Sequence, residues 1–388
     1  MGVFPLDTDS SVNNLQQAAC SGIIRDENEE YSSSCAALSS HFLFVMASII
    51  SFSADYLGTP KSTPSSSVQS SNSNSYSAFD DEIPTVDYSL LFSDDPLQQY
   101  LALEHLGQAS YKFGFFYLVN HGIPDTVLDT LFKRMSEFFD PMNLDERRLY
   151  RKNERGEQIK WDIHSSNSHG EDREYLKVMT HPQCYFPSNP SGFSEVLNEY
   201  HKEMRNVVVG LARAMSRTLG FEENYIEKAF NLESGFDVSA MNLYPPNHAS
   251  KSHFGVVDHT DPGFIITLVQ DVNGGLQILS HNGKWINVCI PHHAILIQLG
   301  DHLEILTNGK YKSHVHRVAV GNNKVQRFTV ATLHGPSIDK FVAPAREFVD
   351  EDHPQAYLGM TYKQSLEAKG HNEIDVKSSL DKIRLKTA

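Results

Sequence analysis

The segment that decides the fold runs from Asn242 to Thr329 and carries His259-Thr260-Asp261, then His316, then Arg327-Phe328-Thr329. His259 and Asp261 are two residues apart, so on an extended segment their side chains point to the same side. The long gap before His316 is sufficient for several antiparallel strands to return it to that pair. Two histidines and one carboxylate are the ligand set of a non-haem iron(II) centre with open positions.

Short apolar runs separated by turn signals surround these residues. Expected turns lie at 274–275, 281–284, 307–310 and 321–324, and expected strands at 264–270, 276–279, 285–290, 294–299, 311–320 and 325–333. Strands and turns at this spacing predict an all-β sandwich or barrel. A jelly roll is the version of that architecture that can hold a metal in its mouth.

Two positions keep more than one interpretation when they are read from the residues alone. His314 and His316 are two apart, so they face the same way on a strand and either could reach the metal. Arg327 interrupts an otherwise apolar strand, and a buried arginine needs a partner because an unpaired desolvated charge is costly. That partner is either an acidic side chain, in a structural ion pair, or an anionic ligand.

The chain resembles the plant 2-oxoglutarate- and iron(II)-dependent dioxygenases over roughly residues 83–370. The resemblance is carried by Asn242-Leu-Tyr-Pro-Pro246, His259-Thr-Asp261, Gly274-Gly-Leu-Gln277, Gly300-Asp301, Thr307-Asn-Gly309, Lys312-Ser313, His316-Arg317-Val318 and Arg327-Phe-Thr329. One departure is that the family's co-substrate motif usually ends in serine, where this chain has Thr329, which keeps a hydroxyl.

The resemblance implies an α+β protein with a double-stranded β-helix (jelly-roll) core braced by N-terminal helices. It places the metal ligand immediately before Arg-Val, which selects His316, beside His259 and Asp261, and leaves His314 as an inward-facing neighbour. It assigns 2-oxoglutarate to four residues: Arg327, Thr329, Tyr244 and Asn242. Iron(II), oxygen and 2-oxoglutarate would carry the reaction, with ascorbate in support and no catalytic side chain beyond the metal centre.

The implied reaction is hydroxylation or another oxidation of a bulky hydrophobic plant metabolite, with release of succinate and carbon dioxide. A steroidal alkaloid is the favoured substrate, and the residues that family position suggests for it are Tyr175, Leu243, Phe264, His334 and Phe341. Hydroxylation or demethylation of a flavonoid, terpenoid or hormone is an alternative, as is a 2-oxoglutarate-independent oxidase of the same fold. A non-catalytic jelly-roll binding module is the alternative from another class.

We expect four parts along the chain. Residues 1–80 form a serine-rich, disordered and dispensable extension, 81–235 a mostly helical region, 236–336 the jelly roll and 337–388 a C-terminal helical segment. Apolar spacing predicts helices at 95–111, 124–139, 145–150, 194–219, 224–230 and 362–369, whereas 161–181 reads as polar and irregular. The remaining histidines of the jelly-roll region are expected on the surface or in loops: His248, His253, His292, His293 and His302.

Composition narrows the class of partner. The formal net charge of −15, from 33 basic and 48 acidic residues, argues against a nucleic-acid surface, which needs clustered basic residues. The four cysteines have no metal-site spacing, which favours free thiols in a reducing compartment. The apolar run at 41–50 is far below the roughly 20 residues that span a bilayer. We therefore expect a cytoplasmic monomer that acts on a small molecule and binds neither membrane nor nucleic acid.

Overall fold

The computed structural model of the chain describes residues 82–151, 158–164, 172–246, 253–272, 274–320, 324–370 and 379–385. All of these residues belong to one compact unit that spans Leu43–Ala388. The expected extension at 1–80, His248 and residues 321–323 of the expected turn at 321–324 lie outside the described residues.

Two sheets form the framework of the described unit. The larger sheet has the order β1 (Thr85–Asp87), β2 (Phe115–Val119), β10 (Ile295–Leu299), β7 (Ile265–Gln270), β12 (Arg327–Ser337), β5 (Gly235–Tyr244), β4 (Arg173–His181) and β3 (Ile159–His164). The smaller sheet has the order β6 (Phe254–His259), β11 (His316–Ala319), β8 (Leu276–Leu279) and β9 (Trp285–Asn287). Apart from the parallel pair β1–β2, neighbouring strands in both sheets run antiparallel.

Helices surround this framework, and the sequence explains where several of them begin. The helices are α3 (Pro96–Lys112), α4 (Asp125–Phe138), α5 (Leu144–Arg148), α6 (Phe193–Thr218), α7 (Tyr225–Phe230), α8 (Asp301–Leu306) and α9 (Tyr362–Gly370), with short 3-10 turns at Ser89–Phe92, Pro141–Asn143, Leu232–Ser234, Arg346–Phe348 and Ser379–Lys382. Asp95 caps α3 by accepting hydrogen bonds from the backbone N–H groups of Leu97 and Gln98, and proline takes the first helical position. A separate two-stranded sheet joins β13 (Phe341–Val342) to β14 (Met360–Thr361).

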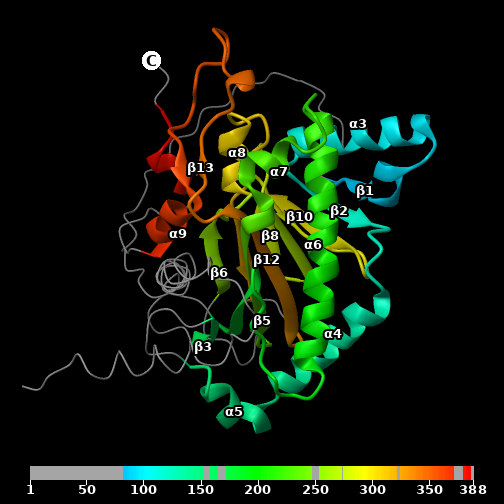
Figure 1. Cartoon of the computed structure of the whole chain (residues 1–388). Helices are drawn as coiled ribbons and strands as arrows, with labels where there is room; N and C mark the ends of the chain where they lie inside the picture. The colour runs from blue at the N-terminus through cyan, green and yellow to red at the C-terminus, as the bar shows by residue number, and fades with distance from the viewer. Residues whose placement is uncertain are drawn as a thin grey trace, which may run out of the picture. The chain divides into compact units, whose positions relative to one another are not determined.

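The larger sheet separates two hydrophobic cores. On one face, Phe328 and Val330 of β12 pack with residues of α4, α6 and α7, and α6 runs along the strands (Figure 1). On the other face, Tyr244 and Leu268 pack with Leu276 and other residues of the smaller sheet. Because side chains alternate along a strand, successive residues of β12 face one core and then the other. The predicted α+β jelly roll braced by helices is confirmed.

The structure corrects three expectations from the sequence. Residues 159–164 and 173–181, expected to be irregular, form β3 and β4 and extend the larger sheet. The helix α8, which the sequence reading missed, begins directly after Gly300. His302, expected on the surface, is fully buried in α8, where its Nδ1 accepts a hydrogen bond from the backbone N–H of Gly263.

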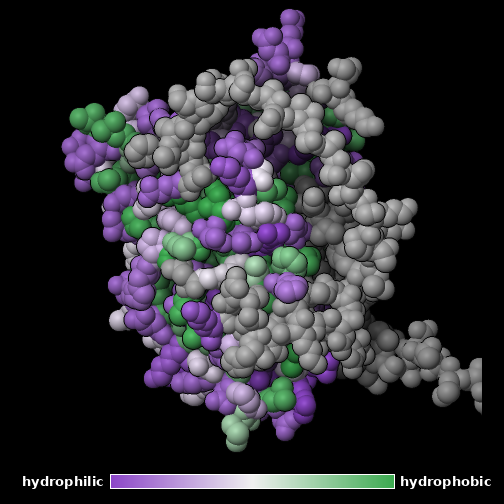
Figure 2. All heavy atoms as spheres, turned by 180° about the vertical axis from the view of Figure 1, so that it is seen from behind, coloured by the Kyte–Doolittle hydropathy of each residue, from purple (hydrophilic) through white to green (hydrophobic). Residues whose placement is uncertain are grey.

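The surface carries small hydrophilic patches and small hydrophobic patches. On the face drawn in Figure 2, hydrophilic and hydrophobic side chains are interspersed among the coloured residues. Within the described part of the chain, no helix is long and apolar enough to cross a membrane.

Candidate metal and co-substrate site

The structure brings His259, Asp261 and His316 together at the ends of β6 and β11. One side-chain ligand atom from each of the three residues lies within 4.8 Å of the others. The Nε2 atoms of His259 and His316 lie 3.6 Å and 3.3 Å from the two carboxylate oxygens of Asp261. His259 and His316 are direct partners in the β6–β11 register, so the antiparallel pairing itself delivers the second histidine.

The Nδ1 atoms of both imidazoles face backbone carbonyl oxygens. Nδ1 of His259 lies 2.7 Å from the carbonyl oxygen of Val257, and Nδ1 of His316 lies 3.3 Å from that of His314. Histidines that bind metals usually donate one ring N–H to such a carbonyl, which leaves the other nitrogen as the ligand. The three side chains can therefore hold one metal ion through two Nε2 atoms and a carboxylate.

A tight turn fixes Asp261 against the start of α8. The carbonyl oxygen of Asp261 accepts a hydrogen bond of 3.0 Å from the N–H of Asp301, and the carbonyl of Gly263 accepts one of 2.8 Å from His302. Gly263 has φ +103°, and a Cβ atom there would lie 2.7 Å from the carbonyl oxygen of His334. Glycine is required at this position because other residues rarely adopt this φ and lack the space.

His314 lies apart from this group. Its Nδ1 lies 2.9 Å from the carbonyl oxygen of Leu279, and its ring packs edge-on against His281 and Phe115. Burial lowers the pKa of His314 to about 4, so the ring is neutral at physiological pH. The described geometry therefore selects His316 over His314 as the partner of His259 and Asp261.

A second histidine cluster lies on the surface, where α4 meets the turn before β10. Asp129, His292 and His293 also offer ligand atoms within 4.8 Å of one another. Both ring nitrogens of His293 already contact carboxylates, Nδ1 at 3.1 Å from Asp125 and Nε2 at 2.9 Å from Asp129. This cluster is explained by hydrogen bonding between α4 and the turn, whereas His259, Asp261 and His316 lie in the partly buried interior.

Arg327 places a positive charge in the space between the two sheets, beside Tyr244. It is 1% exposed, its guanidinium lies 4.8 Å from the ring centre of Tyr244, and one Nη donates to Oε1 of Gln270 at 3.2 Å. Its Nε and its other Nη have no hydrogen-bond partner among the described residues. Burial lowers the pKa of Arg327, although a guanidinium stays protonated in proteins.

Asn242 and Thr329 lie beside Arg327 on the same face. They are direct partners in the β5–β12 register, and Nδ2 of Asn242 donates to Oγ1 of Thr329 at 3.3 Å. A buried guanidinium with two nitrogens that lack a partner in the described part of the chain, and with a hydroxyl next to it, is suited to a carboxylate. Arginine binds carboxylates through parallel N–H···O bonds. These donors fit the distal carboxylate of 2-oxoglutarate.

Among the residues expected to contact the organic substrate, Tyr175 faces the interior. It is fully buried and lies directly opposite Asn242 in the β4–β5 register. Phe341 lies on β13 with 59% of its surface exposed. Tyr175 therefore stays a candidate, and the exposure of Phe341 argues against a place in a closed pocket.

The other three expected contacts lie on the helix-covered face of the larger sheet. Leu243 packs against the core beneath the helices, and the ring of Phe264 lies 5.3 Å from that of Phe230 in α7. Nδ1 of His334 lies 2.9 Å from a carboxylate oxygen of Asp237. Alternation along the strands decides this placement, and these side chains point away from the space that holds the metal ligands.

Four basic residues on β3 and β4 face the same side of the larger sheet as Tyr175 and were missed in the sequence. Lys160 lies directly opposite Lys177, and His164 lies opposite Arg173. Arg173 and Lys177 are each 7% exposed. The sequence signal was Arg-Glu-Tyr-Leu-Lys-Val-Met at 173–179, in which Arg173 and Lys177 are four residues apart, which is two strand periods. The apolar Leu176 and Val178 fall on the alternate positions.

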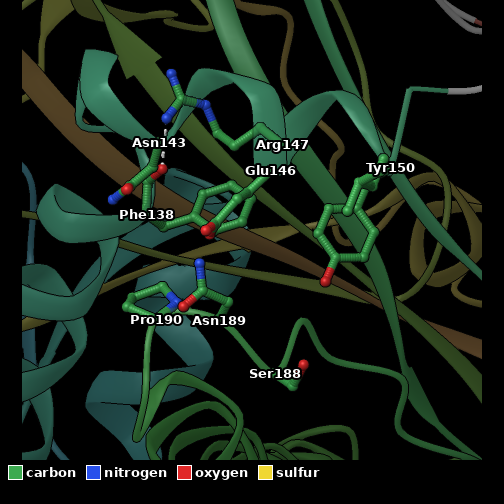
Figure 3. Close-up of a pocket in the computed structure, with 9 residues that line it drawn as sticks. Phe138, Asn143, Glu146, Arg147, Tyr150, Ser188, Asn189 and Pro190 are labelled. Atoms are coloured by element: carbon green, nitrogen blue, oxygen red, sulfur yellow. Dashed lines mark hydrogen bonds between the residues drawn. The ribbon is translucent and has the colours of Figure 1, made fainter.

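A separate cavity of about 260 Å³ lies at the corner of α4 and α5. Figure 3 shows the residues around it: Phe138, Asn143, Glu146, Arg147, Leu149, Tyr150, Ser188, Asn189 and Pro190. Arg147 donates to the carbonyl oxygens of Phe138 and Asp140 and to the carboxylate of Glu174, all at 2.6 Å. Because these hydrogen bonds of Arg147 hold the fold together, we assign the cavity no chemistry.

Comparison with known proteins agrees with this geometry. Residues 235–336 match the model of the 2OG-Fe(II) oxygenase superfamily, and residues 83–202 match that of the N-terminal region of non-haem dioxygenases in morphine synthesis. The chain is 30% identical to 2-oxoglutarate-dependent dioxygenase 19 of Oryza sativa subsp. japonica over 309 residues, which are 78% of this chain and 90% of the relative. It is also 30% identical over 289 residues to flavanone 3-dioxygenase 3 of the same organism, covering 74% of this chain and 87% of the relative.

Solved structures extend the likeness to the fold. The crystal structure of JOX2 in complex with 2OG, Fe and JA has a TM-score of 0.66 and 28% sequence identity, and covers 78% of this chain and 89% of its own. The dioxygenase for auxin oxidation in rice, at 21% identity and a TM-score of 0.65, shares the fold over 78% of this chain and 100% of its own. The chain belongs to the plant 2-oxoglutarate- and iron(II)-dependent dioxygenases. It is an enzyme that uses iron(II), 2-oxoglutarate and oxygen, and it acts on a small molecule.

Proposed function

We propose that this enzyme hydroxylates, or otherwise oxidises, a bulky hydrophobic plant metabolite and releases succinate and carbon dioxide. The observation that carries the 2-oxoglutarate-dependent reaction, against an oxidase without this co-substrate, is Arg327. A buried guanidinium whose Nε and one Nη have no hydrogen-bond partner among the described residues, next to the hydroxyl of Thr329, provides a binding place for a second carboxylate of the co-substrate.

We infer the following division of roles within the site. His259, Asp261 and His316 would hold the iron, and Arg327 with Thr329, Asn242 and Tyr244 would orient 2-oxoglutarate. Bound iron(II) supplies oxygen activation, in which decarboxylation of 2-oxoglutarate is coupled to oxidation of the organic substrate. The protein excludes water from the space between the sheets and holds both substrates in position.

The relatives direct the choice of organic substrate to plant metabolites and hormones. The names of several refer to flavanones or flavonols, such as the flavonol synthase/flavanone 3-hydroxylase of Solanum tuberosum at 30% identity. None of the relatives named above refers to a steroidal alkaloid, which therefore stays a prediction from the sequence. Cytoplasmic location, monomeric state and the absence of membrane binding also stay predictions.

The test is succinate formation by the purified full-length chain. We expect release that requires both iron(II) and 2-oxoglutarate and that rises when an accepted metabolite is added. The Arg327→Gln variant should need far more 2-oxoglutarate for the same rate. Turnover of a metabolite by the wild-type enzyme without 2-oxoglutarate would overturn the proposal, and so would a complete lack of iron-dependent succinate release.

A further inference from the structure

We propose that Glu304 is a positioning residue for the metal site, because its buried carboxylate fixes the irregular segment that leads to His316. This inference rests on the proposed function, since it takes His259, Asp261 and His316 as the residues that hold the iron. Glu304 would act on the site through the backbone between α8 and β11, and not by contact with the metal.

The second histidine of the site follows a segment without regular structure. Residues 312–315 belong to no helix or strand, and His316 is the first residue of β11. Such a segment has no ladder of backbone hydrogen bonds to fix its path, so it depends on individual contacts with its surroundings. A functional constellation must be held within about 0.5 Å of its productive geometry. The contacts of residues 312–315 therefore decide how well His316 is placed.

The N–H of Ser313 connects this segment to α8. It donates to Oε2 of Glu304 at 2.6 Å, and the side chain of Glu304 is 2% exposed. Two residues further along, the carbonyl oxygen of Val315 accepts a hydrogen bond of 2.8 Å from the N–H of Leu279 in β8. A hydrogen bond to a carboxylate away from water is stronger than one between neutral groups. Glu304 therefore provides a firm anchor at the start of the segment, and β8 provides one next to His316.

The same helix also fixes the carboxylate ligand of the site. The N–H groups of Asp301 and His302, the first two residues of α8, donate to the carbonyl oxygens of Asp261 and Gly263. Glu304 lies within the next turn of this helix. One rigid element thus holds Asp261 at its beginning and, through Glu304, the approach to His316. This connection would set the spacing between two ligands that come from different strands.

The other oxygen of Glu304 is held by the C-terminal part of the chain. Tyr357 donates its hydroxyl to Oε1 at 2.5 Å. The side-chain nitrogens of Arg384 and Lys312 lie 3.4 Å and 3.7 Å from the same oxygen. Burial raises the pKa of Glu304, and the hydrogen bond from Tyr357 and the charge of Lys312 act against that rise. With Oε1 held in this way, Oε2 stays directed at Ser313.

A purely structural role would have a different consequence, and Glu174 provides the comparison. Its side chain is 13% exposed and accepts hydrogen bonds from Arg147 and Trp161 at 2.6 Å and 2.7 Å, on the helix-covered face. Loss of either glutamate should destabilise the fold, because buried donors lose their acceptor. Of the two, Glu304 alone has a partner in the segment that leads to a metal ligand. Its loss should therefore also weaken metal binding by the folded chain.

The test measures iron(II) binding to the full-length chain by anaerobic calorimetry without 2-oxoglutarate, far below the melting temperature of each variant. We expect Glu304→Ala to bind iron about tenfold more weakly than the wild type, the size of one hydrogen bond to a charged group. Glu304→Gln should recover most of the affinity, because its amide oxygen can still accept from the N–H of Ser313. Glu174→Ala should lower the melting temperature and keep the iron affinity within about twofold of the wild type.

Hydrogen exchange resolved to single amides tests the inference even if Glu304→Ala does not fold. The amide of Ser313 should be protected in the metal-free wild type, because its bond to Glu304 forms without the metal. Exchange of this amide at the rate of an unfolded peptide would overturn the inference, and so would wild-type iron affinity in a folded Glu304→Ala. A wild type that binds no iron, or unchanged iron binding in His316→Ala, would instead overturn the proposed ligand set.

Discussion

Two histidine–aspartate pairs lie on opposite faces of the framework, and they serve different purposes. His316 and Asp261 lie between the two sheets, with Nε2 of the histidine 3.3 Å from the carboxylate. His334 and Asp237 lie under the helices, with Nδ1 of the histidine 2.9 Å from the carboxylate. The residue types are the same in both pairs, so their surroundings must decide what each pair does.

The helix-side pair has its hydrogen-bonding capacity used by the fold. Asp237 also pairs with Arg205 at 2.5 Å and accepts from the N–H of Gly335, and Nε2 of His334 lies 3.3 Å from the hydroxyl of Thr267. At the interior pair, the Nε2 atoms of two histidines converge on one carboxylate at longer distances. A third ligand atom and backbone-anchored Nδ1 groups indicate a metal site, whereas a closed set of short contacts indicates a structural ion pair.

The largest expected effect comes from the interior pair. His316→Ala should abolish iron binding and turnover, because it leaves two ligands where three are required, while the melting temperature stays near that of the metal-free wild type. His314→Ala should still bind iron with an affinity close to wild type. Calorimetry with iron(II) under anaerobic conditions measures both variants. Retained iron in His316→Ala, with loss in His314→Ala, would reverse the assignment.

The helix-side pair should respond in the opposite manner. Asp237→Asn should lower the free energy of unfolding by about 3 kcal/mol, because removing one partner leaves the largely buried Arg205 without its counter-charge. Iron affinity of the folded variant should stay within about twofold of the wild type, because Asp237 lies on the opposite face of the larger sheet from the metal ligands. A twofold change is far below the 1.4 kcal/mol that corresponds to tenfold. Urea unfolding and iron calorimetry on the same preparation check this. A loss of iron binding without a loss of stability would contradict the comparison.

Substitutions of Arg327 test whether this buried cation binds 2-oxoglutarate or only stabilises the fold. Arg327→Gln should weaken 2-oxoglutarate binding by roughly ten- to a hundredfold, because a hydrogen bond to a charged group is worth about 1.5–3 kcal/mol. Lysine at this position should give an intermediate value, since it keeps the charge and loses the fork. Thr329→Ser should be mild and Thr329→Val more damaging. Unchanged affinity in Arg327→Gln, measured by calorimetry, would exclude the assigned role.

The smallest effect concerns pH. Burial by itself would raise the pKa of Asp237, but His334, Arg205 and His181 together lower it to about 2. A folded pKa below the unfolded value of about 3.9 means that the carboxylate stabilises the fold above about pH 4 and loses this contribution as pH falls toward 2. The stability gap between wild type and Asp237→Asn should therefore narrow by about 2 kcal/mol over that window. Urea unfolding at several pH values measures it, and a constant gap would contradict the prediction.

Several parts of the molecule were accessible from the sequence because they depend on local patterns. The helices α3, α4, α6 and α7 follow from apolar spacing, and their observed ends agree with the expected ends within about two residues. The strand pattern around His259 and His316 predicted the jelly roll, and the fixed spacing of motifs supported the metal ligands and Arg327. Period and motif are properties of neighbouring residues, so they can be read without a structure.

Residues 159–181 could not be interpreted in this way. The alternation of Arg173, Tyr175 and Lys177 is visible, but which face of the sheet they occupy depends on pairing with β5. The same reason explains Leu243, Phe264 and His334, which sequence position placed at the substrate and strand alternation placed under the helices. A shift of one residue in register would exchange the two faces.

The sequence by itself determined the class of enzyme, the jelly-roll architecture, the metal-ligand triad and the buried arginine as candidates, because each depends on residue type and spacing. The family motif favoured His316 over His314, and the tertiary structure brought His316 beside His259 and Asp261. Only the tertiary structure gave Asp237 and His334 a structural pairing. It also brought Lys160 and Lys177 face to face. Those outcomes depend on long-range strand register, which joins residues far apart in the chain and leaves no local pattern to read.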